Sequence, residues 1–155
     1  MKFFCNSPQL LYANMKYEER TYRYLINNDN LFSYNAVIQE SDLWISSDSD
    51  LTQISYQSLI RHRETLETYI KLYPQFRTSL VPLAGNKYDP PIIKEMISKS
   101  RVCGVGPMAS VAGAIAEYVG KDLLPYTENL IIENGGDIFM HSKKDKIVAL
   151  FAGES

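Results

Sequence analysis

Short runs of alternating or β-branched residues predict a sheet in this chain. The predicted strands cover residues 21–26, 35–39, 43–46, 130–133, 138–140 and 146–152. The dipeptide Asn134-Gly135 separates two of these runs and is a strong hairpin signal. The last run has no closing element after it, so we expect its open edge to pair with another chain or with a further segment.

Apolar positions three or four residues apart predict three helices. The first begins near Tyr56 and is ended by Pro74, and the second opens at Pro90-Pro91, because proline is tolerated in a first turn. The third begins at Pro107 and carries so few polar residues that we expect it to be buried on most sides. Within it, Gly113 follows an alanine by four residues, a spacing that would let the helix pack very close to a neighbour.

Strands and helices together predict an α+β fold with an antiparallel sheet and packed helices. We expect an N-terminal arm over residues 1–16 and a single domain over residues 17–155. The 155 residues are 45% hydrophobic and 22% charged, which is the balance of one globular domain with its own core.

Charge and hydropathy exclude two classes of partner. The net charge is −2 and no block of five basic residues occurs, which argues against nucleic acid as a partner. No segment approaches the ~20 apolar residues of a membrane span, and the apolar run at the N-terminus is too short for a signal peptide. We therefore expect no membrane partner and a cytoplasmic location.

Metal ligands and catalytic groups leave no clear signal. The chain has two cysteines, Cys5 and Cys103, and two histidines, His62 and His141, and none of them stands at a metal-binding spacing. Neither histidine has a convincing serine, cysteine or metal partner in the sequence. No metal site and no catalytic residue are predicted from these side chains.

The first candidate binding segment is Gly104-Val105-Gly106-Pro107-Met108. A helix beginning at Pro107 would present free N–H groups and a partial positive charge, which suit a phosphate group. Glycines let a ligand approach the backbone, and Ser110 could add a hydroxyl group. The alternative is that these glycines only end one helix and start the next.

The second candidate is Glu133-Asn134-Gly135-Gly136-Asp137. Two carboxylates flank a backbone that can adopt positive φ, so the turn could direct them at a sugar hydroxyl, a ring nitrogen or a metal. The alternative is a plain Asn-Gly hairpin with solvated flanks. The second glycine exceeds what a two-residue turn needs, which favours the functional interpretation.

Two weaker candidates are more simply explained by structure. Glu40-Ser41-Asp42 fits a turn in which the aspartate hydrogen-bonds locally. Arg61-His62-Arg63 lies within the first predicted helix, where the three side chains point in different directions and a solvated face is the simpler interpretation.

The strings VCGVGPMASVAGAIAEYVG and LIIENGGDIFMHS resemble the ApbE-like superfamily. That superfamily includes flavin transferases that move FMN from FAD onto a threonine or serine of a target protein. Further matches at residues 17–23, 40–43, 63–70 and 74–82 resemble a smaller, uncharacterised ApbE-like family of archaea and bacteria. The resemblance covers most of the chain from Tyr17 onward.

The resemblance implies a T-fold-like α+β domain in which residues 134–137 and the helix start at residues 106–113 line one flavin nucleotide cleft. It implies FAD or FMN as the cofactor. The Mg²⁺ ligands of the transferases lie further toward the C-terminus and have no counterpart before Ser155. The C-terminal part of the domain is therefore expected to be missing, and Mg²⁺ would bind only if another segment supplied its ligands.

Three hypotheses follow. The leading one is a protein with a partial flavin or nucleotide site that is inactive alone. The second is a non-catalytic oligomeric assembly or binding protein, supported by the 11 tyrosines and the unfinished last strand. The third is an enzyme completed by another polypeptide. The second predicts a homo-oligomer in which the last strand pairs with another segment.

Overall fold

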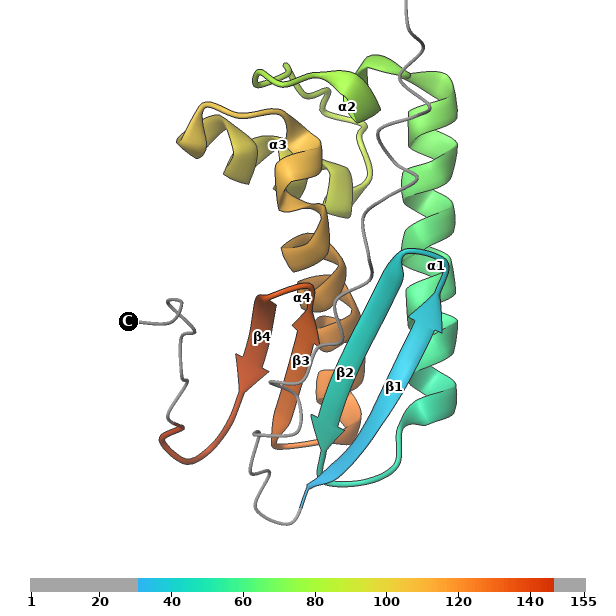
Figure 1. Ribbon diagram of the computed structural model, residues 1–155, viewed down its shortest axis with the longest axis vertical. Helices are drawn as coiled ribbons and strands as arrows, with labels where there is room; N and C mark the ends of the chain where they lie inside the picture. The colour runs from blue at the N-terminus through green and yellow to red at the C-terminus, as the bar shows by residue number, and fades with distance from the viewer. Residues whose placement is uncertain (1–30, 147–155) are drawn as a thin grey trace, which may run out of the picture.

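The computed structural model describes residues 31–146, which form a four-stranded sheet and a set of packed helices (Figure 1). The sheet is antiparallel throughout, and its strands lie in the order β1-β2-β3-β4. The strands are β1 (Phe32–Ile38), β2 (Ser41–Ser47), β3 (Leu130–Asn134) and β4 (Asp137–His141). The predicted α+β fold with an antiparallel sheet and packed helices is confirmed.

Two hairpins make up the sheet, and all the described helices lie between them in the sequence. The first hairpin turns at Gln39-Glu40, next to the paired residues Ile38 and Ser41. The second turns at Gly135-Gly136, where both glycines have positive φ (62° and 96°). This is one residue later than the predicted Asn134-Gly135 turn, because Asn134 is the last residue of β3 and pairs with Asp137. The hairpins join through antiparallel pairing of β2 with β3.

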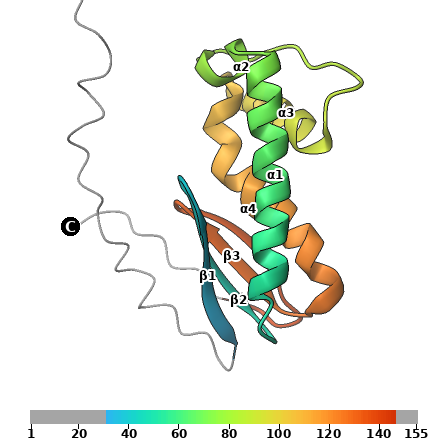
Figure 2. The same cartoon turned by 90° about the vertical axis from the view of Figure 1, so that its right-hand side faces the viewer.

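Two long helices cover one face of the sheet, as Figure 2 shows. The helical elements are α1 (Thr52–Leu72), α2 (Gln75–Thr78), α3 (Pro91–Cys103), α4 (Val111–Leu123) and the 3₁₀ helices η3 (Pro107–Ser110) and η4 (Leu124–Tyr126). Helices α1 and α4 pack against the sheet, whereas α2 and α3 lie beyond its end (Figure 1).

The core lies between the sheet and α1 and α4. Period-2 alternation in β2 points Leu43 and Ile45 toward the helices, and Ile132 of β3 lies beside them. Helix α4 meets these strands with Ile115 and Val119. All five side chains are at most 2% exposed, so this apolar layer fixes the register of the two central strands.

Element boundaries differ from the expectations at a few points. The helix predicted from Pro107 begins as the 3₁₀ turn η3, and α3 continues past its last predicted apolar residue to Cys103. Lys146, the first residue of the last predicted strand, is not in a strand. The rest of that strand, the predicted strand at residues 21–26 and the predicted arm at residues 1–16 lie outside the described residues.

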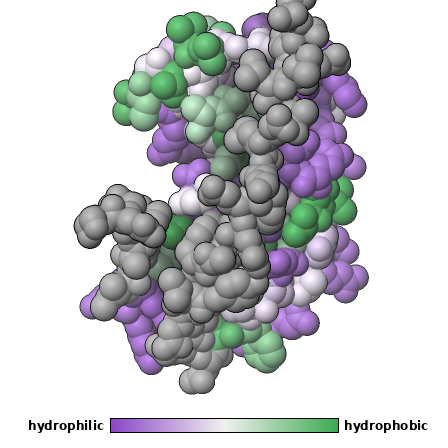
Figure 3. All heavy atoms as spheres, in the orientation of Figure 1, coloured by the Kyte–Doolittle hydropathy of each residue, from purple (hydrophilic) through white to green (hydrophobic). Residues whose placement is uncertain are grey.

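Apolar side chains are also exposed at the end of the molecule away from the sheet. Leu80 and Val81, in the loop after α2, are 87% and 63% exposed, and Val102, near the end of α3, is 85% exposed. Figure 3 shows apolar surface at the upper end of that view, where these segments lie.

Within residues 31–146, no single helix is long and apolar enough to cross a membrane. Two successive helical segments, Pro91–Cys103 and Pro107–Tyr126, together have the length and composition of a membrane span, but the chain bends by 105° between them.

Candidate functional site: a cleft between α3, α4 and β4

Helices α3 and α4, the turn η3 and strand β4 enclose a cleft of about 350 Å³. In Figure 1, α3 lies above β4, and α4 packs beside both. This volume lies at the lower end of the range of small-molecule sites. The cleft is lined by Glu95, Met96, Lys99, Ala109, Ser110, Gly113, Ala114, Glu117, Asp137, Ile138 and Phe139.

Gly113 and Asp137 form the polar end of the cleft. A side chain at Gly113 would point at Asp137, because a Cβ atom there would lie 3.5 Å from the Asp137 carboxylate. Asp137 is exposed, and its carboxylate makes no hydrogen bond or ion pair with any other side chain of residues 31–146. A free carboxylate on the wall of a cleft can accept hydrogen bonds from a ligand.

Three further charges line the cleft, and they are already paired. Glu95 and Lys99 form an ion pair one turn apart on α3 (3.3 Å). Glu117 binds Lys121 on α4 (2.7 Å), and this hydrogen bond raises the pKa of Lys121 above its usual range. With Glu95 and Glu117 offset by lysines, Asp137 is the carboxylate of the lining that favours hydrogen-bond donors and cations over phosphate.

The rest of the wall is apolar or uses its polar groups internally. The half-buried Phe139 ring and Ile138, which is 47% exposed, offer apolar surface, whereas Met96 is fully buried behind the wall. The Ser110 hydroxyl lies within hydrogen-bonding distance of two carbonyl oxygens, those of Pro107 (2.9 Å) and Met96 (3.3 Å). Its lone pairs remain available as acceptors.

The Gly135-Gly136 turn and the residues before it fix the position of Asp137. The Asn134 side chain donates to the Ala112 carbonyl on α4 (3.0 Å), which ties the end of β3 to the helix. The Gly136 amide donates to the Glu133 carboxylate (2.8 Å) across the turn. Residues 133–136 thus hold the first residue of β4 against the start of α4.

The first candidate segment has a different role in the fold. Gly104 ends α3 in the left-handed region (φ 69°), and its amide and that of Val105 donate to carbonyls of α3. A Cβ atom at Gly106 would lie 1.8 Å from the Ser79 carbonyl oxygen, so this glycine permits a close backbone contact. Pro107 is buried.

Of the nine predicted binding residues, Ser110 and Asp137 line the cleft. Asn134, Gly135 and Gly136 build the turn beside it. Gly104 and Gly106 match the alternative in which the glycines end one helix and start the next, and Met108 packs against the core. Ligand contact at any of the nine stays a prediction.

Sequence reasoning missed the contribution of α3 to the cleft. Glu95, Met96 and Lys99 stand at helical spacing and could be grouped from the sequence, but nothing there indicates that this face lines a cleft together with β4. Gly113 was expected to serve close helix packing, and the structure places it on the cleft wall.

The two weaker candidates form internal contacts. Arg63 donates to Ser41 (2.7 Å), Gln39 (2.6 Å) and Glu40 (3.0 Å), which ties the first hairpin to α1. Arg61 and His62 both contact Asp122 of α4. In residues 31–146, no group of three or more His, Cys, Asp or Glu side chains is arranged to hold a metal ion.

The fold and the cleft define an α+β protein with a small-molecule-sized cleft at the edge of an antiparallel sheet. The chain belongs to the family described as AbpE bacteria, whose model matches residues 23–155.

Several archaeal proteins are similar in sequence to this chain. The UPF0280 protein of Methanococcus aeolicus is 38% identical over 120 residues, which are 76% of this chain and 48% of the relative. The UPF0280 protein of Methanocaldococcus jannaschii is 38% identical over 80% of this chain and 50% of its own. The UPF0280 protein of Methanopyrus kandleri is 34% identical over 80% of this chain and 51% of the relative. The chain spans about half the length of the curated relatives it matches.

These comparisons correct the resemblance drawn from the glycine-bearing strings. The relatives are UPF0280 proteins, an uncharacterised family, so the expected membership of the ApbE-like superfamily of FMN transferases is wrong. Short glycine-rich strings are weak family markers, because the same turn and helix-end chemistry recurs in unrelated proteins. The T-fold-like description, which rested on that resemblance, loses its basis.

Proposed function

We propose that the cleft between α3, α4 and β4 binds a small organic ligand that combines a flat ring with hydrogen-bond donors. The ring portion of a flavin or the nucleoside portion of a nucleotide has this chemistry. The observation that carries the proposal is the free Asp137 carboxylate on the cleft wall, beside the space left by Gly113.

The residues that line the cleft favour the ring end of a nucleotide over its phosphate end. The half-buried Phe139 ring offers an aromatic contact for a ring, and the exposed Ile138 offers an apolar one. Asp137 accepts hydrogen bonds from hydroxyl, amine or imide groups and repels phosphate, whereas Glu95 and Glu117 are offset by Lys99 and Lys121. We therefore expect the ring and its donors, rather than a phosphate chain, to occupy this cleft.

The test is a titration of the chain with riboflavin, adenosine, FMN and AMP, followed by amide NMR shifts at Gly113 and Phe139. We expect riboflavin or adenosine to shift these amides, and the phosphorylated forms to bind more weakly at low salt. Asp137→Asn should weaken binding about tenfold, the effect of losing roughly 1.4 kcal/mol from a charged hydrogen bond.

Two further variants serve as a blocking substitution and a control. Gly113→Val puts methyl groups beside Asp137 and should block the ligand while the chain stays folded. Asp145→Asn, which removes an exposed carboxylate outside the cleft lining, should leave affinity unchanged. If neither riboflavin nor adenosine shifts the cleft amides at millimolar concentration, the proposal is wrong.

A further inference from the structure

A second cleft lies on the opposite face of α3. It has a volume of about 460 Å³ and is lined by Gly85, Asn86, Lys94, Ile97, Ser98, Arg101 and Val102. Five of these residues stand at i, i+3, i+4, i+7 and i+8 on α3, which is one stripe of a helix. Glu95, Met96 and Lys99 face the first cleft, so α3 is a wall shared by both.

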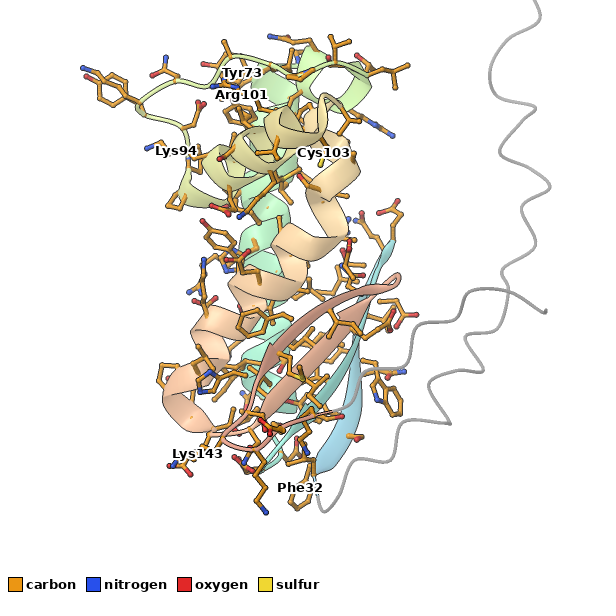
Figure 4. All side chains as sticks on the ribbon, turned by 90° about the vertical axis from the view of Figure 1, so that its left-hand side faces the viewer. Phe32, Tyr73, Lys94, Arg101, Cys103 and Lys143 are labelled. Atoms are coloured by element: carbon orange, nitrogen blue, oxygen red, sulfur yellow. The ribbon has the colours of Figure 1, made fainter. Side chains whose placement is uncertain are left out.

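The charges of the second cleft are the reverse of those in the first. Its lining includes two cations, Lys94 and Arg101, and no carboxylate. Within residues 31–146 neither cation has an ion-pair partner, although Lys99 on the other face of the same helix is paired with Glu95. Arg101 donates to the Leu83 carbonyl (3.3 Å), and both cations lie at the helical end of the molecule (Figure 4).

Neutral polar groups stand between and beside these cations. Ser98, one turn after Lys94, is exposed. The Asn86 side-chain carbonyl accepts a hydrogen bond from the Tyr88 amide (3.0 Å), which leaves its NH₂ group to donate. Asp89 is the carboxylate close to Gly85, but it is buried and accepts hydrogen bonds from Tyr69 (3.1 Å) and the Asn86 amide (2.6 Å). Its charge is therefore partly offset within the fold.

We propose that this second cleft binds an organic anion, in which a phosphate or carboxylate group is attached to a small apolar body. The anionic group would be held by Lys94, Arg101 and the hydroxyl of Ser98. The apolar body would cover Val102, whose exposed side chain gains from removal from water. This site is independent of the function proposed for the first cleft.

The test uses phenyl phosphate, benzoate, inorganic phosphate and benzyl alcohol, followed by amide NMR shifts at Gly85 and Ser98. We expect phenyl phosphate and benzoate to bind, inorganic phosphate to bind more weakly because it lacks the apolar body, and benzyl alcohol not to bind. If phenyl phosphate is much tighter than benzoate, the natural group is a phosphate. The reverse order indicates a carboxylate.

Charge and apolar variants separate this site from nonspecific attraction. Lys94→Gln and Arg101→Gln should each weaken phenyl phosphate at least threefold, whereas Lys144→Gln, at a distant exposed lysine, should not. Val102→Ser should weaken phenyl phosphate more than inorganic phosphate. Equal weakening by Lys94→Gln and Lys144→Gln, or shifts at Gly113 in place of Ser98, would overturn the proposal.

Discussion

Gly120 of α4 lies directly under the ring of Phe139. A Cβ atom at this position would lie 2.2 and 2.3 Å from two ring carbons, which is far inside a normal contact. Gly113, two turns earlier on the same helix, has its nearest neighbour at 3.5 Å. The same added methyl group should therefore have opposite effects at the two positions.

We predict that Gly120→Ala lowers the free energy of unfolding by about 1–3 kcal/mol, because the ring must move and β4 with it. Gly113→Ala should be neutral or stabilising by up to about 1 kcal/mol, since alanine favours the helix. Urea unfolding of both variants measures the difference. Equal stabilities would show that Phe139 moves at no cost.

Asp48 connects the loop after β2 to the loop before β3. Its carboxylate accepts hydrogen bonds from the Thr127 hydroxyl (2.9 Å), the amides of Glu128 and Asn129 (both 2.8 Å) and the Asn129 side chain (2.9 Å). These hydrogen bonds, with the Asn129 side chain first, outweigh partial burial and lower the pKa of Asp48 to about 2. The charged form is therefore the one that stabilises the fold.

This contribution should be complete above about pH 4 and be lost as the pH falls toward 2, because the folded pKa is below the usual one. We predict that Asp48→Asn lowers stability at pH 7 by roughly 1–2 kcal/mol, a range reduced for solvent exposure. The variant should lose less stability than the parent between pH 4 and pH 2 in urea unfolding. Asp145→Asn is the control, and parallel pH profiles for Asp48→Asn and the parent would contradict the prediction.

Site residues could be predicted where a local sequence signal, such as a glycine-containing turn, indicates them. Asn134-Gly135 predicted a hairpin; the structure places its turn one residue later, at Gly135-Gly136, and this turn delivers Asp137 to the cleft. The close contact of Gly106 with Ser79 was not predictable, because its partner belongs to a distant loop. The tight contact at Gly120 was missed for the same reason.

At the scale of elements, α1 and α4 are joined by one carboxylate. Asp122 Oδ2 accepts from Ser58 (2.5 Å) and lies 2.7 Å from His62 Nε2, and Arg61 contacts the same oxygen. Burial raises the pKa of Asp122, but these hydrogen bonds outweigh it, so the net pKa is lowered. The His62 ring also packs edge-on against Tyr118 of α4.

We predict that Asp122→Ala destabilises the chain by about 1–3 kcal/mol, because two partly buried donors lose their acceptor. A double-mutant cycle with His62→Ala should give a coupling energy of at least ~0.5 kcal/mol. Arg61→Ala is the control, since the Arg61 side chain is 62% exposed and its ion pair should contribute little. A coupling energy near zero would mean that His62 acts only by packing.

Most element types were predictable because their apolar spacing is regular. The strands at residues 43–46 and 130–133 and the helix ended by Pro74 all match β2, β3 and α1 within a few residues. That α3 and β4 line the same cleft could not be predicted, since no local signal says which helix face lies across from which strand. Long-range packing therefore determines which residues line the cleft.

At the scale of the whole molecule, α3 stands between two clefts with opposite charge. The cations of the second cleft are separated from the carboxylates of the first by the helix itself, whose diameter with side chains is about 10–12 Å. The Debye length at physiological salt is about 8 Å, so the two fields are largely screened from each other. Ligands at the two clefts should bind nearly independently.

We predict that saturating phenyl phosphate changes the dissociation constant of adenosine by less than about twofold at 150 mM salt. The measurement is an adenosine titration with and without phenyl phosphate, read at the Gly113 amide. At low salt, screening is weaker, so bound phenyl phosphate can modestly increase the affinity for adenosine. A tenfold change at 150 mM salt would mean that α3 shifts when either cleft is filled.

The pairing of β2 with β3 has a consequence for how the chain acquires its structure. Each hairpin closes locally, but the two central strands can align only after every intervening helix has been synthesised. Closing so long a loop slows folding, because its entropy is lost before the contacts form. During translation, the first hairpin must therefore wait with one edge of β2 unsatisfied, and that interval is when this protein is most exposed to misassociation.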